Sequence, residues 1–271
     1  MSDRMYYSER IGIEKEKLSL KELSTVFVVI VNELTKKDYF KEFFGYEDNF
    51  GRTVEGSMGN TFENYSLAVL GRRISDPFYN LKPNYTEVDL FDAIELLHDN
   101  VTLKTIVDEF GLGPAFAEFN ITESQSVYRS KINKHLARYG SGWELLEDGT
   151  IRELVQEEFR GLVDSPIQYG EEENVDKRIR RAAKSFLKYG ASELDKKAAL
   201  IEIGGALEYI RTELEEFNKK ATSDIFNLLN NYDLRHNNKL KHADYDVGIY
   251  YPWMFYTFLS TYNAFVMMKK K

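Results

Sequence analysis

Cysteine is absent from this chain of 271 residues. Without a thiol, the chain can form no disulfide, no cysteine nucleophile and no zinc site built on thiolates. This absence is compatible with a reducing cytoplasm, and we expect the protein to be located there.

Long apolar runs are missing as well. No stretch approaches the roughly 18 consecutive apolar residues that a membrane-spanning helix requires. The first sixteen residues are polar and mixed in charge, unlike a signal peptide. We therefore expect no association with a membrane.

Positive charge is in deficit, since the formal net charge is -8. This balance argues against a non-specific grip on nucleic acid over the whole surface. An RNA partner would need a local basic patch. Three short basic runs are candidates for such a patch: residues 177–181, Lys239 with Lys241, and residues 269–271. Each run is equally well explained as ordinary helix surface.

Histidine is scarce, and its distribution is the most informative feature of the chain. Two of the four histidines, His236 and His242, lie within the polar segment 233–242, after Arg235. Strongly apolar segments flank it, which predicts an exposed connection between helices. Histidine transfers protons near neutral pH, and arginine can hold the charge that develops on a phosphate. Together they suffice for RNA cleavage without a metal, although short motifs also match by chance.

The chain as a whole is predicted to be mainly α, with residues 1–165 forming an N-terminal helical domain and residues 171–271 a four-helix bundle. Ser19 and Glu22 predict a capping box at the start of a helix that ends near Lys37. Asp148-Gly149 between short apolar runs predicts a β-hairpin near 143–152. Residues 45–85 read as irregular structure with one short helix, and helices are predicted at 88–98, within 103–110, at 123–138 and at 154–163.

The C-terminal pattern is helical after a linker that begins at Ser165-Pro166. Apolar spacing predicts helices over 175–189, 193–219 and 222–233, and Pro252 suits the first turn of the last one. The adjacent Gly204 and Gly205 indicate close packing against a neighbouring helix, at a cost of about 1 kcal/mol per glycine. The last helix is rich in large aromatic residues: Trp253, Phe255, Tyr256, Phe258, Tyr262 and Phe265. They exceed what one face of a single helix can bury, so we expect a homodimer through the bundle. A deep core within a monomer is the alternative.

A helical bundle with this motif before its last helix resembles the HEPN superfamily, whose pattern is an arginine, four to six residues and a histidine. Here the spacer has six residues, and His236 fills the place after the arginine where a polar residue is favoured. Residues 7–12, Tyr-Ser-Glu-Arg-Ile-Gly, are similar to the opening of AbiJ-type abortive-infection proteins, and an ordinary polar segment would explain them equally well.

The resemblance implies a metal-independent endoribonuclease of a phage-defence or toxin system. RNA, with tRNA among the candidates, would be the substrate, and an antitoxin or a phage product would be a further partner. Arg235 and His242 would be the catalytic pair and His236 an auxiliary residue. Asn237, Asn238, Lys239 and Lys241 are local candidates for RNA contacts, and no cofactor or metal is implied.

Two other interpretations stay open. A HEPN-like bundle could bind a nucleotide, a protein or a phage product without cutting RNA, which would suit the acidic net charge. A metal-dependent enzyme is a weaker alternative, because His236 and His242 lack the spacing of a helical metal pair. The carboxylates Asp233, Asp244 and Asp246 read as solvated loop charge. His98 is expected to cap its own helix, and His135 to lie on the surface.

Overall fold

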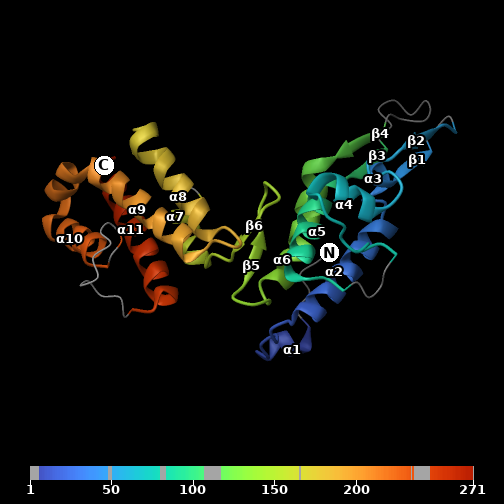
Figure 1. The fold of residues 1–271 in the computed structure, drawn as a ribbon, viewed down its shortest axis with the longest axis horizontal. Helices are drawn as coiled ribbons and strands as arrows, with labels where there is room; N and C mark the ends of the chain where they lie inside the picture. Colours follow the sequence, from blue (N-terminus) through green and yellow to red (C-terminus); the bar gives the residue numbers. More distant parts are fainter. Residues whose placement is uncertain are drawn as a thin grey trace. The chain divides into compact units, whose positions relative to one another are not determined.

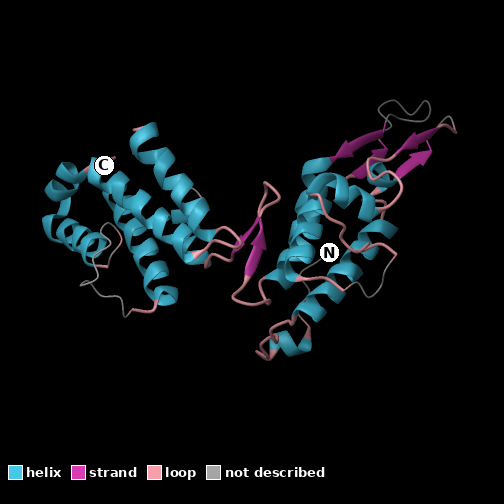
Figure 2. Ribbon diagram, in the orientation of Figure 1, coloured by secondary structure: helices cyan, strands magenta, loops and turns pink. Residues whose placement is uncertain are grey.

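The computed structural model describes residues 6–47, 51–79, 84–106, 117–164, 166–232, 234 and 245–270. Most of these residues are helical, and the strands that they contain form small two-stranded antiparallel sheets (Figures 1 and 2). The prediction of a mainly α chain with a small β-hairpin is confirmed. Among the described residues, no helix is long and apolar enough to cross a bilayer.

The chain divides into two compact units, Met1–Leu154 and Val155–Lys271. The sequence predicts a boundary between residues 165 and 171, so the division lies earlier in the chain. Helix α7 (Glu157–Val163) accounts for the difference, because its apolar residues pack on the C-terminal core. These residues are Phe159, Leu162 and Val163.

Three helices form the core of the N-terminal unit: α2, α5 and α6 contact one another in pairs. The predicted capping box of α2 is confirmed, since Ser19 Oγ accepts from the Glu22 N–H and the Glu22 carboxylate accepts from the Ser19 N–H. Thr86 and Asp89 repeat this arrangement at the start of α5. The elements of the unit are α1 (Tyr7–Arg10), α2 (Leu20–Lys36), α3 (Lys41–Phe44), β1 (Gly45–Glu47), β2 (Thr53–Glu55), α4 (Phe62–Leu70), α5 (Glu87–Asn100), β3 (Leu103–Ile106), β4 (Ala117–Asn120), α6 (Ile121–Leu136), β5 (Trp143–Leu145) and β6 (Ile151–Glu153).

The hairpin of β5 and β6 lies where the Asp-Gly pair predicts it. Gly149 has a φ of 81°, a left-handed conformation that glycine adopts without steric cost. Glu144 and Arg152 face each other across the two strands as a buried ion pair, with 2.9 Å between Arg152 Nε and Glu144 Oε1. The hairpin is therefore held by a polar pair as well as by its turn.

Two segments of this unit differ from the prediction. Residues 103–106 form strand β3 instead of a helix, because they pair in antiparallel register with β4, Leu103 opposite Asn120. Thr105 and Ile106 are β-branched residues that suit a strand. The rest of that predicted helix, residues 107–110, lies outside the described residues. Within 45–85, β1 and β2 pair with each other, and α4 is the short helix that the sequence predicts.

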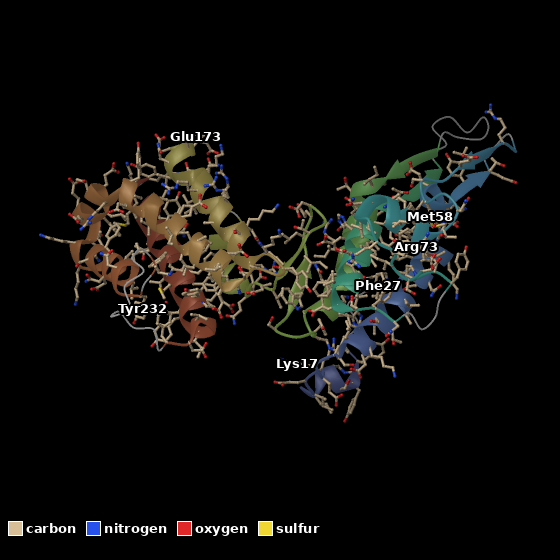
Figure 3. All side chains as sticks on the ribbon, viewed as in Figure 1. Lys17, Phe27, Met58, Arg73, Glu173 and Tyr232 are labelled. Carbon is tan, nitrogen blue, oxygen red and sulfur yellow. The ribbon has the colours of Figure 1, made fainter. Side chains whose placement is uncertain are left out.

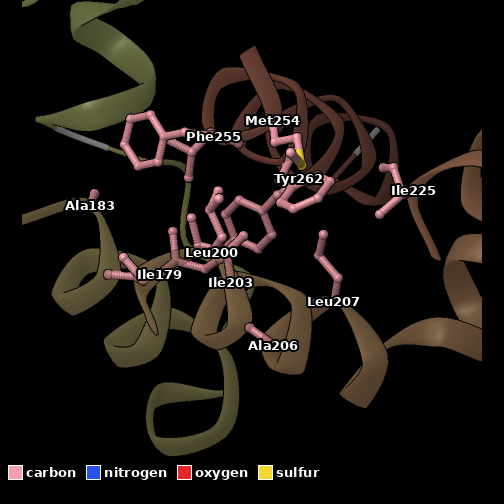
Figure 4. Packing of buried hydrophobic residues seen from close by; sticks show 14 of the residues in the cluster. Ile179, Ala183, Leu200, Ile203, Ala206, Leu207, Ile225, Met254, Phe255 and Tyr262 are labelled. Atoms are coloured by element: carbon pink, nitrogen blue, oxygen red, sulfur yellow. The ribbon is translucent and has the colours of Figure 1, made fainter. Parts of the chain in front are cut away.

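The C-terminal unit is a helical bundle built around α9, which contacts α8, α10 and α11. Figure 4 shows side chains of all four helices meeting in one cluster, with Ile179 and Ala183 from α8, Ile203 from α9, Ile225 from α10 and Tyr262 from α11. After α7, its elements are a π-helical turn η1 (Glu172–Asp176), α8 (Lys177–Leu187), α9 (Glu193–Tyr209), α10 (Arg211–Asn231) and α11 (Val247–Lys269).

The single helix predicted over 193–219 is wrong, because the chain breaks at Ile210, between α9 and α10. A second break, at Asn218, agrees with the predicted boundary between this helix and the next. Asn218 has extended backbone angles, φ -156° and ψ 92°, and its Oδ1 accepts from the Ala221 N–H at 3.0 Å. This is the geometry of a helix N-cap. The next helical segment therefore begins at Asn218, and the Thr222 hydroxyl donates back to the Leu214 carbonyl at 2.9 Å.

The last helix begins five residues before Pro252. Asp246 caps it, since its Oδ1 accepts from the Gly248 N–H at 2.8 Å. Pro252 therefore lies inside α11 and not in its first turn. Because proline has no N–H, the carbonyl four residues earlier, on Gly248, loses its helical partner.

The two glycines of α9 lie in close contact with neighbouring helices, as the sequence indicates. A Cβ on Gly204 would lie 2.6 Å from Leu229 Cδ2 on α10, and a Cβ on Gly205 would overlap the guanidinium of Arg178 on α8. Leu229 is fully buried, whereas Arg178 is half-buried and can move towards solvent. The first glycine is thus a packing requirement, and the second is not.

We expect Gly204→Ala and Gly205→Ala to change stability in opposite directions. Each gains about 1 kcal/mol of helix propensity. At Gly204 the added methyl group also forces buried Leu229 aside, at about 1–3 kcal/mol. Denaturant unfolding of the full chain should show a net loss for Gly204→Ala and a gain for Gly205→Ala. Equal gains in both variants would contradict this packing.

A buried carboxylate attaches the segment before α8 to the bundle. Asp176 accepts from the Tyr262 hydroxyl at 2.7 Å and from the N–H groups of Tyr169 and Gly170 at 2.7 and 2.8 Å. Burial alone would raise the pKa of Asp176, but these hydrogen bonds outweigh it and lower the pKa below its usual value. The ionised form is therefore the one that stabilises the fold.

The stability that Asp176 contributes should be present at neutral pH and lost in acid. Because its folded pKa is lowered, the contribution is complete above the unfolded pKa of about 3.9 and disappears as pH falls through the folded pKa. We expect Asp176→Asn to cost about 2 kcal/mol of unfolding free energy at pH 7. The difference from wild type should shrink below pH ~4. A difference that stays constant down to pH ~3 would show that the charge is not involved.

Candidate functional site

The predicted catalytic segment connects α10 to α11. Arg235, His236 and His242 lie outside the described residues, as do the four candidate RNA contacts, Asn237, Asn238, Lys239 and Lys241. The structure describes the residues on both sides of this segment, Tyr232 and Leu234 before it and Tyr245 after it. These flanking residues determine how the segment is attached to the bundle.

The two ends of the segment are joined by a hydrogen bond. The Tyr245 hydroxyl donates to the Tyr232 carbonyl at 2.8 Å, across thirteen positions of sequence. Leu234 is 2% exposed and belongs to the buried core of the unit. Figure 3 labels Tyr232 where α10 ends. The bundle thus brings the two ends of the connection together and anchors the first of them in its core.

Aromatic rings reinforce this junction. The ring centroids of Tyr232 and Tyr245 are 5.2 Å apart, and Tyr250 on α11 lies 5.5 Å from the first and 5.3 Å from the second. Trp253 extends the group, 5.9 Å from Tyr250. Such pairs contribute about 0.5–1.5 kcal/mol each beyond the area that they bury. We call Tyr232, Tyr245, Tyr250 and Trp253 the aromatic junction.

The amino end of α11 follows the segment directly. A helix amino end carries partial positive charge and free N–H groups, which favour a bound anion. Here the Asp246 carboxylate already accepts from the Gly248 N–H. An anion near the segment would therefore compete with this cap, and its binding would depend chiefly on side chains.

The aromatic residues that predict a dimer are largely buried within the unit. Phe255 stacks on Phe186 of α8 with the ring centroids 4.2 Å apart, and Tyr256 stacks on Phe159 of α7 at 4.5 Å. Trp253 is 47% exposed. The remaining members of the set, Phe258, Tyr262 and Phe265, are buried in the cluster of Figure 4. The surplus of aromatic residues is thus absorbed mainly by packing inside one chain.

In the two basic runs that the structure describes, several side chains are paired with carboxylates. On α8, Lys177 pairs with Glu173 at 3.1 Å, Arg180 with Glu172, and Arg181 with Glu202. At the end of α11, Lys269 contacts Glu213 at 2.6 Å. Exposed pairs of this kind are worth little stability, but they cancel positive charge locally. Residues 177–181 therefore form a mixed surface of both signs.

The other two histidines lie in the N-terminal unit. His98 is buried beneath the hairpin turn, where its Nε2 is 3.4 Å from an Arg129 nitrogen and its Nδ1 leaves no room for a side chain at Gly149. It contacts these groups instead of capping its helix. Burial lowers its pKa, and the charge of Arg129 adds to the effect. His135 is half-buried on α6, and burial lowers its pKa too.

Metal ligands do not gather in the described parts of the chain. Among those residues, no three histidine or acidic side chains lie close enough together to hold a metal ion. Asp246, one of three acidic residues considered as loop ligands, is engaged as a helix cap. Asp233 and Asp244 lie outside the described residues.

The structural support of the segment was missed in the sequence. Tyrosines at 232, 245, 250 and 251 flank the Arg/His motif on both sides, a signal that could have predicted an aromatic junction there. Comparison of the chain with protein-family models, with curated proteins and with solved structures gives no match.

The hydroxyl of Tyr245 gives a direct test of the junction. Tyr245→Phe keeps the ring but removes the hydrogen bond to the Tyr232 carbonyl, which should cost about 1 kcal/mol. Amide hydrogen exchange over 247–251 should accelerate, because the start of α11 loses its connection to α10. Tyr209→Phe, which removes a hydroxyl from a tyrosine that is 56% exposed, is the matched control. If both variants exchange like wild type, the hydrogen bond does not hold the junction.

Proposed function

We propose that this protein is a metal-independent endoribonuclease that cuts RNA with the Arg/His segment between α10 and α11. The main observation in support of this proposal is that the bundle holds both ends of that segment together. An arginine and a histidine with six residues between them lie in a connection whose ends are joined by Tyr245 and Tyr232. Catalytic groups are commonly found on loops that a rigid scaffold positions. The resemblance to the HEPN superfamily adds a role as effector in phage defence or a toxin system.

The chemistry follows from the residue types. His242 would take the proton from a ribose 2′-hydroxyl, whose oxygen then attacks the neighbouring phosphorus. Arg235 would hold the added negative charge with two parallel hydrogen bonds. The bond from phosphorus to the 5′-oxygen breaks, and that oxygen takes a proton from a second group, for which His236 is the nearest candidate in sequence. The products are a 2′,3′-cyclic phosphate and a 5′-hydroxyl.

A homodimer is part of this proposal, because two such segments facing each other would supply twice the number of catalytic groups. Most aromatic residues of α11 are used within one chain. The exposed apolar residues near the start of that helix, Ile249 and Trp253 at 65% and 47%, support a contact there.

A non-catalytic binding module is the second candidate, and one observation favours it. The net charge is -8, and three basic residues of α8, Lys177, Arg180 and Arg181, are paired with Glu173, Glu172 and Glu202. A nuclease needs a positive surface to hold the phosphate backbone. Under the nuclease proposal, Lys239 and Lys241 beside the motif would provide that surface.

Two substitutions separate these functions. Purified protein is incubated with total tRNA in EDTA, and single-turnover cleavage and binding are measured for each variant. His242→Ala should lower the cleavage rate by about 10²–10⁴-fold, since it removes a proton-transfer group. Arg235→Lys should keep most of the affinity and lose most of the rate, because lysine offers a point charge in place of a planar fork.

The controls exclude trivial explanations. His135→Gln changes a histidine outside the motif and should cut RNA like wild type. A DNA oligonucleotide should stay intact, because it lacks the 2′-hydroxyl. RNA that is bound but uncut by wild type would favour the binding module, and full activity in folded His242→Ala would remove that histidine from the mechanism.

A further inference from the structure

A second candidate site lies in the N-terminal unit, away from the Arg/His motif. A cavity of about 610 Å³ opens where the β1–β2 hairpin meets the ends of α5 and α6. Its described lining carries three carboxylates, those of Glu42, Glu55 and Asp99. That lining contains no basic side chain. Within the described residues, neither Glu42 nor Glu55 is in an ion pair. The described lining of the cavity is therefore negatively charged, which favours a cationic ligand.

The walls of the cavity are held in place by backbone packing. Gly56 approaches Gly45 and Phe44 so closely that no side chain fits, which presses the hairpin against α3. The Met58 N–H donates to the Phe43 carbonyl at 2.9 Å on the same side (Met58 is labelled in Figure 3). The hairpin that carries Glu55 is thus fixed relative to the helix that carries Glu42.

A buried hydroxyl without a partner in the lining is a second, independent observation that points to a ligand site. Thr102 is 5% exposed and lines the cavity, yet its Oγ1 has no hydrogen-bond partner within the described structure. Burying a hydroxyl without a partner costs about 1–3 kcal/mol by protein mutational data. The neighbouring Asn100 amide, by contrast, donates to the Tyr65 hydroxyl at 2.8 Å and to the Leu96 carbonyl at 2.7 Å. A ligand with a hydrogen-bond donor would satisfy Thr102.

The arrangement of the carboxylates indicates the kind of cation. Within the described residues, no three acidic side chains converge as a metal ion requires. Apolar and aromatic side chains lie among the acids in the lining: Phe43, Tyr46, Val54 and Ile121. An extended molecule whose ammonium groups are separated by methylene chains matches this lining of acidic and apolar side chains. Its charges would reach the carboxylates, its methylene groups would cover the apolar wall, and an aromatic face attracts ammonium as well.

We propose that this cavity binds an aliphatic polyamine, with ammonium groups at Glu42, Glu55 and Asp99 and an N–H donor towards Thr102. Simple ion pairing at the surface would not need the apolar wall or the buried hydroxyl. The site would give the N-terminal unit a ligand of its own, independent of whether the C-terminal segment cuts RNA.

Calorimetric titration of the full chain with spermidine tests this proposal. We expect saturable binding to one site, weakened about tenfold or more in the double variant Glu42→Gln/Asp99→Asn, because each lost charge pair is worth on the order of 1 kcal/mol. The matched control is Glu47→Gln/Glu87→Gln, which removes two acidic charges of the same unit that do not line the cavity. The control should bind like wild type.

Thr102→Val gives a second test, because it should affect thermal stability and spermidine affinity in different directions. It keeps the shape of the side chain but removes the unsatisfied hydroxyl, so the thermal midpoint without ligand should rise or stay level. Spermidine binding should nevertheless weaken. Equal binding by the double variant and its control would overturn the site. Binding of tri-lysine or Mg²⁺ in place of spermidine would overturn the assignment to a polyamine.

Discussion

The architecture of the C-terminal unit depends on how closely three helices can approach α9. At Gly204 no side chain fits, because buried Leu229 of α10 occupies the space where a Cβ would lie. Once α10 is seated there, its carboxyl end and the amino end of α11 are near enough for Tyr245 to reach the Tyr232 carbonyl. The small side chains of one helix thus determine where the predicted catalytic segment leaves the bundle and where it returns.

Around this core, polar groups act at the points where the chain changes direction. Asp176 gathers two N–H groups and the Tyr262 hydroxyl before α8 begins. Asn218 caps the second half of α10, and Asp246 caps α11. Asn218 and Asp246 each accept from an N–H in the first turn of a helix, and Asp176 accepts from N–H groups of the preceding loop and from the Tyr262 hydroxyl. The apolar cluster then stabilises helices whose ends are already defined.

Charge is distributed in a way that bears on both proposed sites. Three basic side chains of α8, Lys177, Arg180 and Arg181, are paired with neighbouring glutamates. In the N-terminal unit, Glu42 and Glu55 beside the cavity are not paired in this way within the described residues, and the buried hydroxyl of Thr102 lies with them. Paired charges leave little net positive charge on this face of α8, whereas unpaired carboxylates beside the cavity favour a cation.

The sequence by itself determined the features that depend on nearby residues. The Ser19/Glu22 capping box, the Asp148-Gly149 turn and the glycine contact at 204 were all predicted, because each follows from short-range geometry or from the lack of a side chain. Tertiary structure alone decided the rest. Residues 103–106 are a strand because β4 offers a partner. The helix predicted over 193–219 is divided at Ile210 into α9 and α10, although the sequence pattern there is that of one continuous helix. The motif at Arg235 and His242 can be read from the sequence, but its attachment through Tyr232 and Tyr245 depends on contacts between helices that no local pattern specifies.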